Sequence, residues 1–400
     1  MSHINKRVPK RRFEEFNNAD AWEQRKFIEI INRLSKTSNS SILPKVEYED
    51  IIAEEGRLNK DISNKFDSRK GILFQPKNIL YGKLRPYLKN WLYPDFKGVA
   101  VGDFWVFEAI EATPRFIYNL IQSDSYQKVA NDTAGTKMPR SDWTKVSNSS
   151  FFIPKESSEQ KRIGTFFKQL DHTITLHQRK LEKVKALKAA YLSEMFPAKG
   201  ETKPKRRFVG FTNAWEQSKL GELADIIGGG TPSTSNFKFW DGDIDWYSPA
   251  EIGNQNYLFG SKKKITQEGL EKSSARIHPI GTVLFTSRAG IGNTAILGRP
   301  GATNQGFQSI LPKKNILDSY FIFSRTPELK KYGEASGAGS TFVEVSGKQM
   351  ARMPILMPTF YEQQKIGSFF KQLDKTITIH QRKLQKLQNI KKAYLNEMFI

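Results

Sequence analysis

The sequence predicts a mixed α+β protein in which two related globular domains are separated by two long antiparallel coiled-coil helices. Three observations predict this architecture: a long helical segment occurs twice, a short basic and aromatic block occurs twice, and the regions between these blocks differ strongly. The chain has 400 residues, a length that is typical of two or three domains with cores of their own.

Internal repetition is the clearest feature of the chain. The segment Glu159–Phe196 recurs at Glu362–Phe399, displaced by 203 residues, and 26 of its 38 positions are identical. A block that reads PKRRF, followed by WEQ, starts at Pro9 and again at Pro204. Between these blocks, sparse Gly, Pro and Phe landmarks keep a displacement of 203 or 204 residues. We therefore expect one shared backbone that carries two different surfaces.

The repeated segments read as long helices. The patterns Ser157-x-x-Gln160 and Thr359-x-x-Glu362 predict a capping box at each start. Residues at alternating steps of four and three form a heptad seam in each copy. The seam positions are Ile163, Phe167, Leu170, Ile174, His177 and Leu181, and then Ile366, Phe370, Leu373, Ile377, His380 and Leu384.

The length of these helices suggests how they are used. A helix of about 38 residues is roughly 57 Å long at 1.5 Å per residue, too long for burial inside one small domain. We expect the two copies to pack side by side in antiparallel orientation, related by an approximate two-fold axis. The polar seam residues His177 and His380 either lie at the edge of the seam or fix its register.

These features divide the chain into six predicted parts. They are a basic arm (1–21), a first globular domain (22–155), a central long helix (156–197), a basic linker (198–214), a second globular domain (215–358) and a C-terminal long helix (359–400). Within the globular domains we expect strands at 71–74, 78–81, 102–107, 281–287 and 308–311, and helices at 114–129 and 318–332.

The charge of the chain points to a polyanionic partner. The 63 Lys and Arg residues outnumber the 41 Asp and Glu residues, giving a net charge of +22, and a nucleic acid attracts such a surface through its phosphates. Basic, amide and hydroxyl side chains gather on the connections expected in both domains, although any single one also fits an ordinary solvated turn. The DNA-binding candidates are Tyr81, Lys83, Arg85, Lys89, Asn90, Lys137, Arg140, Ser287, Arg288, Asn293, Asn304, Gln305, Ser340 and Thr341.

Several chemistries are disfavoured. The chain has no cysteine, which excludes disulfides and thiol nucleophiles. The Gly-rich run 228–233 lacks the lysine of a P-loop, so we interpret it as a turn. Asp241, Asp243 and Asp245 alternate, which suggests one face of a strand, but no second group of ligands accompanies them. We therefore predict neither catalytic nor metal-binding residues, and the absence of a long apolar run favours a cytoplasmic location without a membrane anchor.

The repeated residues also carry a family resemblance. The motifs FFKQLD, TIT, HQRKL, AYL and EMF in both helical copies, together with the PKRRF and WEQ openings, resemble the specificity subunit of a type I restriction–modification enzyme. The resemblance covers essentially the whole chain. It implies that each globular domain reads one half of a split DNA target, while the paired helices act as a spacer of roughly 57 Å, which corresponds to about 17 base pairs.

The same resemblance implies which partners do the chemistry. Two methyltransferase subunits would dock on the helices, and motor–nuclease restriction subunits would join them. S-adenosylmethionine, ATP and Mg²⁺ would belong to those partners, and this chain would be non-catalytic. Two alternatives remain open: a freestanding nucleic-acid-binding scaffold without a methyltransferase, and an enzyme whose active site the motifs do not reveal.

Overall fold

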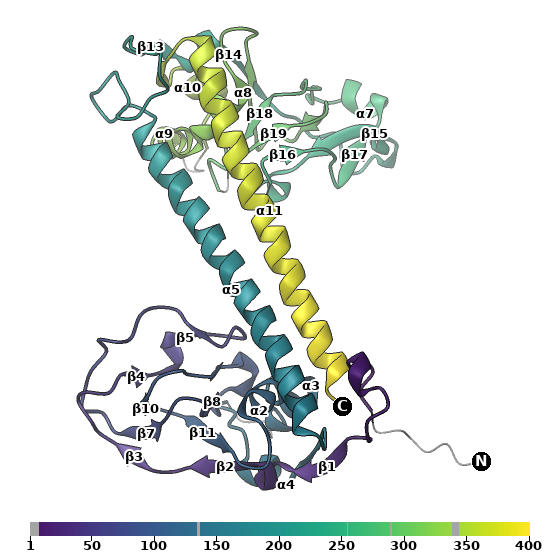
Figure 1. The fold of residues 1–400 in the computed structure, drawn as a ribbon. Helices are drawn as coiled ribbons and strands as arrows, with labels where there is room; N and C mark the ends of the chain where they lie inside the picture. The colour runs from purple at the N-terminus through teal and green to yellow at the C-terminus, as the bar shows by residue number, and fades with distance from the viewer. Residues whose placement is uncertain (1–7, 134–136, 254, 289, 338–343) are drawn as a thin grey trace. The chain divides into compact units, whose positions relative to one another are not determined.

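The computed structural model describes residues 8–133, 137–253, 255–288, 290–337 and 344–400. Contacts divide the chain into unit 1, which comprises residues 1–178 and 382–400, and unit 2, which comprises residues 179–381. The boundary cuts both long helices, α5 (Ser157–Glu194) and α11 (Phe360–Met398). Each unit is therefore built from one globular region and from parts of both helices (Figure 1).

Unit 1 contains short strands and short helices before α5. Its sheets have the strand orders β3-β7-β10-β4 and β2-β11-β8-β9, and β1 pairs with β12 and β5 with β6. The strands are β1 (Glu23–Lys26), β2 (Ile31–Leu34), β3 (Thr37–Ser38), β4 (Lys45–Val46), β5 (Ile51–Ile52), β6 (Arg57–Leu58), β7 (Gly71–Phe74), β8 (Ile79–Gly82), β9 (Trp91–Leu92), β10 (Gly98–Ala100), β11 (Phe104–Ala109) and β12 (Ser150–Ile153). The helices are α1 (Phe27–Ile30), α2 (Pro114–Leu120), α3 (Asp124–Ala130) and α4 (Trp143–Asn148).

Unit 2 repeats this plan with differences in the strands. Its sheets have the orders β14-β21-β18-β19-β16 and β17-β15-β20, and β13 pairs with β22 as β1 does with β12. The strands are β13 (Glu216–Lys219), β14 (Ala224–Gly228), β15 (Trp240–Tyr247), β16 (Tyr257–Leu258), β17 (Lys263–Ile265), β18 (Val283–Phe285), β19 (Thr294–Leu297), β20 (Ala302–Thr303), β21 (Gln308–Pro312) and β22 (Pro354–Met357). The helices are α6 (Leu220–Leu223), α7 (Gln267–Glu271), α8 (Ser319–Ser324), α9 (Thr326–Gly337) and α10 (Gly347–Ala351).

The predicted α+β class with two long antiparallel helices is confirmed. In unit 1, Phe166 packs edge-on against Tyr394 with ring centroids 5.0 Å apart, and Asp171 pairs with Lys391 at 2.8 Å. From the first of these contacts to the second, the residue number rises along α5 and falls along α11, so the helices run in opposite directions there. Unit 2 shows the same arrangement, in which Tyr191 packs against Phe369 and Lys188 pairs with Asp374 at 2.6 Å.

The seam predicted from the heptads differs in burial along its length. Six of its members are buried, namely Ile163, Phe167, Leu181, Ile366, Phe370 and Leu384, and the other six are half-buried. Ile163 and Phe167 belong to the same apolar cluster as Trp22 and Phe399. The start of each helix is thus part of a globular core as well as part of the helix pair, which ties the helix to the domain that it leaves.

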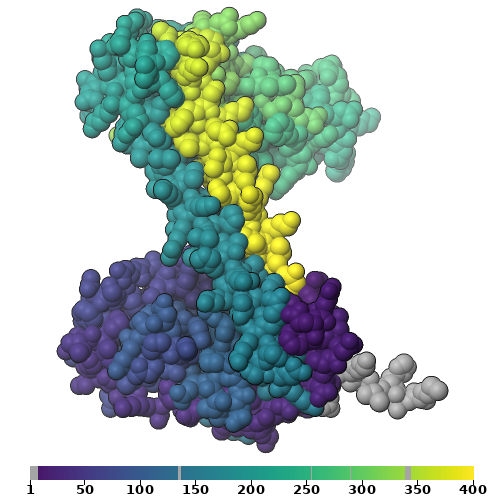
Figure 2. All heavy atoms as spheres, viewed as in Figure 1, coloured from purple at the N-terminus to yellow at the C-terminus, as the bar shows by residue number. Residues whose placement is uncertain are grey.

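A buried ion pair fastens the basic opening block to the start of each helix. Arg12 donates two hydrogen bonds of 2.7 Å to the carboxylate of Glu159, and Trp22 Nε1 donates a third at 3.1 Å. In unit 2, Arg207 donates two bonds of 2.7 Å to Glu362 in the same way. In unit 1 the opening block is the N-terminal arm, which lies in purple against both helices in Figure 2.

The first predicted capping box and the predicted helix at 114–129 are both wrong. Gln160 does not complete a capping box, because its side chain accepts a bond from Thr113 N (2.8 Å) and donates one to Pro154 O (3.0 Å). The helix predicted at 114–129 breaks into α2 and α3, since Ser123 Oγ caps a new helix by accepting a bond from Tyr126 N.

The helix predicted at 318–332 is likewise divided, into α8 and α9. Pro327 stands in the first turn of α9, where its missing N–H and fixed φ favour a helix start over a helix interior. Of the two predicted capping boxes, only the Thr359 half of the second forms, with Thr359 Oγ1 accepting a bond of 3.4 Å from Glu362 N. The Glu362 carboxylate instead accepts hydrogen bonds from Arg207, so it binds the basic opening block of unit 2 and does not cap its own helix.

Candidate nucleic-acid interface

In unit 1 the loop that follows β8 is an exposed and strained connection. Arg85 and Lys89 both lie in the left-handed region, with φ of 49° and 54°, on either side of a 3-10 turn at Pro86–Leu88. Non-glycine residues adopt this conformation only at a cost, and such strain concentrates at functional sites. The turn leaves Arg85 and Tyr87 exposed.

Two further segments meet this loop and bring the predicted residues Lys83 and Arg140 together around Asp103. Lys83 N donates to Asp103 O at 2.9 Å, and Lys83 O accepts from Ser141 N at 2.8 Å. The carboxylate of Asp103 pairs with Arg140 at 3.0 Å and lies 3.6 Å from Lys83 Nζ. The three segments present a basic surface with one acidic residue at its centre.

The side chain of Tyr48 connects the segment of Asp103 to the loop after β8. Its hydroxyl donates to Asp103 O at 2.5 Å and accepts a bond of 3.0 Å from Leu84 N. A tyrosine hydroxyl is protonated at physiological pH, and burial raises the pKa of Tyr48 still further, so it remains a donor to Asp103 in alkaline solution as well. Sequence reasoning missed Tyr48, because nothing in the local pattern links it to residues 84 and 103.

Unit 2 builds a corresponding surface from four segments. Ser287 N donates to Gly306 O at 2.8 Å, and Val345 N donates to Ser287 O at 3.1 Å. Next to these bonds, Arg288 pairs with Glu344 at 2.9 Å. Arg288 is about half exposed, with 47% of its side-chain surface accessible, which leaves the guanidinium free to exchange its carboxylate for a base edge or a phosphate.

The Gly-rich run 228–233 adds the fourth segment. Gly230 N donates to Thr303 O at 2.8 Å, and the hydroxyl of Thr231 contacts the side chain of Gln305. A side chain at Gly229 would collide with the carbonyl oxygen of Asn304, so glycine there permits the close approach. The interpretation of the run as a turn is wrong, because Gly228 ends β14 and residues 229–233 form an irregular connection after it, which places Thr231 beside the predicted residue Gln305.

The two surfaces share one backbone scaffold. The bonds Lys83 N to Asp103 O and Ser141 N to Lys83 O in unit 1 correspond to Ser287 N to Gly306 O and Val345 N to Ser287 O in unit 2. The residues are displaced by 203 or 204 positions, as the sequence landmarks predict. The side chains at these places differ: Ser287 and Gly306 stand where unit 1 has Lys83 and Asp103, and Glu344 stands where unit 1 has Arg140.

Three of the predicted site residues are buried, which contradicts the surface position expected for them. Tyr81 belongs to β8 and is fully buried against Trp105, and burial raises its pKa to about 12. Ser287 and Asn90 are also buried. The reason is the same in each case: the residue lies in or next to a sheet strand, not at the tip of a connection.

The other predicted residues are distributed as follows. In unit 1, Lys83 and Arg140 lie on either side of Asp103, and Arg85 N donates to Pro139 O beside them at 2.7 Å. In unit 2, the segments of Arg288 and of Asn304 and Gln305 are joined by the bond from Ser287 N to Gly306 O. Lys137 and Asn293 are exposed, while Lys89 pairs with Glu54 at 2.8 Å at the other end of its loop. Ser340 and Thr341 lie outside the described residues.

The acidic residues of β15 do not gather around a metal position. Asp245 is buried and pairs with Arg299 at 2.8 Å, while Asp241 and Asp243 are exposed. In the described part of the chain there is no group of three or more His, Asp or Glu side chains suited to a metal ion. The described helices also include none with the length and apolar character needed to cross a membrane.

Comparison with known proteins shows the same duplication. The family model described as "Type I restriction modification DNA specificity domain" matches residues 20–186 and again 213–389. The MjaIX type I specificity subunit of Methanocaldococcus jannaschii is 34% identical over 189 residues, which cover 46% of this chain and 44% of that protein. The EcoR124I/EcoR124II specificity subunit of Escherichia coli is 29% identical over 167 residues, which cover 40% of this chain and 41% of that protein. The matches thus span less than half the length of these two relatives.

Other matches extend over nearly the whole chain. The HindI specificity subunit of Haemophilus influenzae is 21% identical and covers 92% of this chain and 97% of that protein. The solved type I restriction–modification S subunit from M. genitalium has a TM-score of 0.65 with 14% identity, covering 98% and 99% of the two chains. A chain from a structural study of type I complex assembly has a TM-score of 0.53 with 19% identity, covering 94% and 96%. At these identities the solved structures support the fold.

Proposed function

The chain belongs to the type I restriction modification DNA specificity family, and from that membership we propose how its two units divide the recognition of DNA. The surface around Lys83, Arg85 and Arg140 reads one half of a bipartite target, and the surface around Arg288, Asn304 and Gln305 reads the other half. The unread gap between the halves is set by the two long helices. The observation that supports this division most is the shared pair of backbone bonds that carries different side chains in the two units.

The partners follow from the same proposal. Double-stranded DNA binds the two basic surfaces, and two methyltransferase subunits dock on α5 and α11. Restriction subunits complete the assembly. S-adenosylmethionine, ATP and Mg²⁺ act on those partners, while this chain chooses the target. The net charge of +22 favours DNA as the first of these partners.

The proposed function is tested by co-expression with the methyltransferase that accompanies the gene. We expect the chain to co-purify with it, and long-read sequencing to show methylated adenines at one split motif that disappears when the gene is deleted. Failure to co-purify, together with unchanged adenine methylation in the deletion strain, would favour a freestanding nucleic-acid scaffold instead. DNA methylated or cut by the purified chain alone would show an enzyme.

Replacing Arg288 by alanine tests the reading of one base. If the guanidinium contacts a base edge, its loss costs about 1–3 kcal/mol of discrimination at one position of the target. We therefore expect methylation to spread to sites that differ at that position. Arg352→Ala removes the same charge from an exposed position at the end of α10 and serves as the control with unchanged selectivity. A uniform loss of binding to all sequences would instead assign Arg288 to a phosphate.

A further inference from the structure

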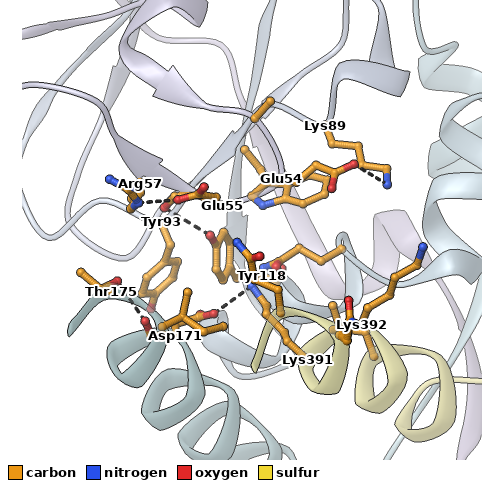
Figure 3. Close-up of a pocket in the computed structure, with 18 of the residues that line it drawn as sticks. Glu54, Glu55, Arg57, Lys89, Tyr93, Tyr118, Asp171, Thr175, Lys391 and Lys392 are labelled. Atoms are coloured by element: carbon orange, nitrogen blue, oxygen red, sulfur yellow. Dashed lines mark hydrogen bonds and ion pairs between the residues drawn. The ribbon is translucent and has the colours of Figure 1, made fainter. Parts of the chain in front are cut away.

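Unit 1 contains a cavity of about 480 Å³ beside the helix pair. It is bounded by the β5–β6 hairpin, β9, the start of α2, and parts of α5 and α11 (Figure 3). Its volume lies within the range of small-molecule sites in proteins. Trp91, Tyr93 and Tyr118 supply aromatic surface, so the cavity suits a ligand with a flat ring.

Two residues that line the cavity each carry a buried polar atom without a hydrogen-bond partner among the described residues. These atoms are the indole Nε1 of Trp91 and the side-chain oxygen Oε1 of Gln122, whose residues are 3% and 7% exposed. The amide nitrogen of Gln122 is already committed to Tyr118 O at 2.9 Å. Unpartnered buried polar atoms are costly and uncommon. A ligand that brings one acceptor for Trp91 and one donor for Gln122 would satisfy both.

The unpaired charges of the cavity are mainly positive. Glu54 pairs with Lys89, Glu55 with Arg57, and Asp171 with Lys391, so three of the four carboxylates are neutralised by neighbours. The fourth, Asp124, is exposed in the first turn of α3.

Arg115 and Lys392 supply the unpaired positive charge. Arg115 is half-buried and lies over the ring of Tyr93 at 4.3 Å, with no ion pair to any described residue. Lys392 lines the same space and is exposed, also without an ion pair to the described residues. Two unpaired cations at the edge of an aromatic cavity favour an anionic group on the ligand.

Unit 2 shows that the shared scaffold does not require this arrangement. Gln363 accepts a bond from Asp318 N as Gln160 does from Thr113 N, which makes Tyr320 the positional equivalent of Arg115. Tyr320 donates to Asp374 at 2.8 Å and accepts a bond of 2.9 Å from Asn256. In unit 2, the residue at this position therefore forms a hydrogen bond to the helix residue Asp374. In unit 1, the equivalent residue is the unpaired cation Arg115.

We propose that the cavity of unit 1 binds a nucleotide. The base lies against Tyr93 and Trp91, its edge supplies the acceptor and the donor that Trp91 and Gln122 lack, and the phosphate faces Arg115 and Lys392. A nucleoside monophosphate combines a flat ring, both hydrogen-bonding roles and a negative charge in one molecule of suitable size. The nucleotide is either free or part of a nucleic-acid strand. The inference is independent of the proposed reading of DNA, because the cavity shares only Lys89 with the predicted DNA-binding residues.

Calorimetric titration of the full-length chain with AMP and CMP tests the proposal, with adenosine and inorganic phosphate as partial ligands. We expect saturable binding of a monophosphate, at least about tenfold tighter than either partial ligand, a factor that corresponds to 1.4 kcal/mol. A dinucleotide that binds more tightly than the monophosphate assigns the site to a strand. A monophosphate that binds more tightly assigns it to a free nucleotide.

Three variants separate the contacts. Arg115→Gln should weaken monophosphate binding at least about tenfold and leave adenosine binding unchanged, while Trp91→Phe should weaken both. Lys392→Gln, at an exposed position, gives a smaller loss of monophosphate binding and serves if Arg115→Gln does not fold. The matched control is Arg33→Gln, which removes a guanidinium from a stacked position 4.3 Å over Trp143 in the same unit but outside the cavity.

Several results would overturn the proposal. They are the absence of saturable binding by any of the nucleotides, binding of inorganic phosphate as tight as that of AMP, and equal affinities of the Arg115→Gln and wild-type chains. None of these results bears on whether the chain directs methylation, so the failure of this inference and that of the proposed function are distinguishable.

Discussion

Replacing Glu159 by alanine is expected to lower the free energy of unfolding of unit 1 by about 3–5 kcal/mol, the range found when one partner of a buried ion pair is removed. Glu159 accepts two bonds from Arg12 and one from Trp22, and the side chains of Arg12 and Glu159 are only 7% and 2% exposed. The substitution leaves a guanidinium buried without a counter-charge and an indole N–H without an acceptor.

Chemical denaturation, with hydrogen exchange to locate the transition in unit 1, measures this effect. Glu397→Ala is the matched control, because Glu397 pairs with Arg11 in the same arm but 37% of its side chain is exposed. Exposed pairs contribute about 0–1 kcal/mol, so the control should change stability little. Equal losses in the two variants would contradict the role assigned to burial.

Exchanging residues 22–155 for the corresponding region of another family member is expected to replace one half of the methylated motif completely and to leave the other half unchanged. The physical reason is that the proposed reading surface of unit 1 is built by segments within that range, around residues 83–90, 103 and 140. Unit 2 builds its own surface without any of these residues.

Methylation mapping in cells that carry the exchanged gene measures the result. The donor region needs a Trp at the position of Trp22 and a free backbone N–H at that of Thr113, since these groups bond to Glu159 and Gln160 of the retained helix. A motif altered in both halves, or in neither, would argue against separate reading by the two units. The reciprocal exchange of residues 215–358 should alter the opposite half.

Local repetition explains which elements could be predicted. The long helices followed from a seam that persists over many turns and occurs twice, so the signal did not depend on tertiary context. The break at Ser123 was missed because a serine inside an apolar pattern fits either a helix interior or a cap, and only the bond from Tyr126 N decides between them.

The site was predicted less well, because its members are defined by contacts between distant segments. Tyrosine is a residue type that often contacts nucleic acids, but Tyr81 lies in β8 and its side chain is buried in the core. Thr231 lies in a run that reads only as a turn, and its contact with Gln305 joins residues 74 positions apart. Asp103 and Glu344 belong to none of the motifs found in the sequence, yet each pairs with an arginine in the structure.

The composition of unit 1 has a consequence for the order in which the protein acquires its structure. Phe399 packs against Trp22 and Phe167 with ring centroids 6.3 and 6.2 Å apart, but residues 382–400 are translated only after all of unit 2. At about 5–20 residues per second, the ribosome needs roughly 10–40 s to supply them once residue 178 has been made. During that interval the apolar surface that Phe399 covers on Trp22 and Phe167 stays exposed to water.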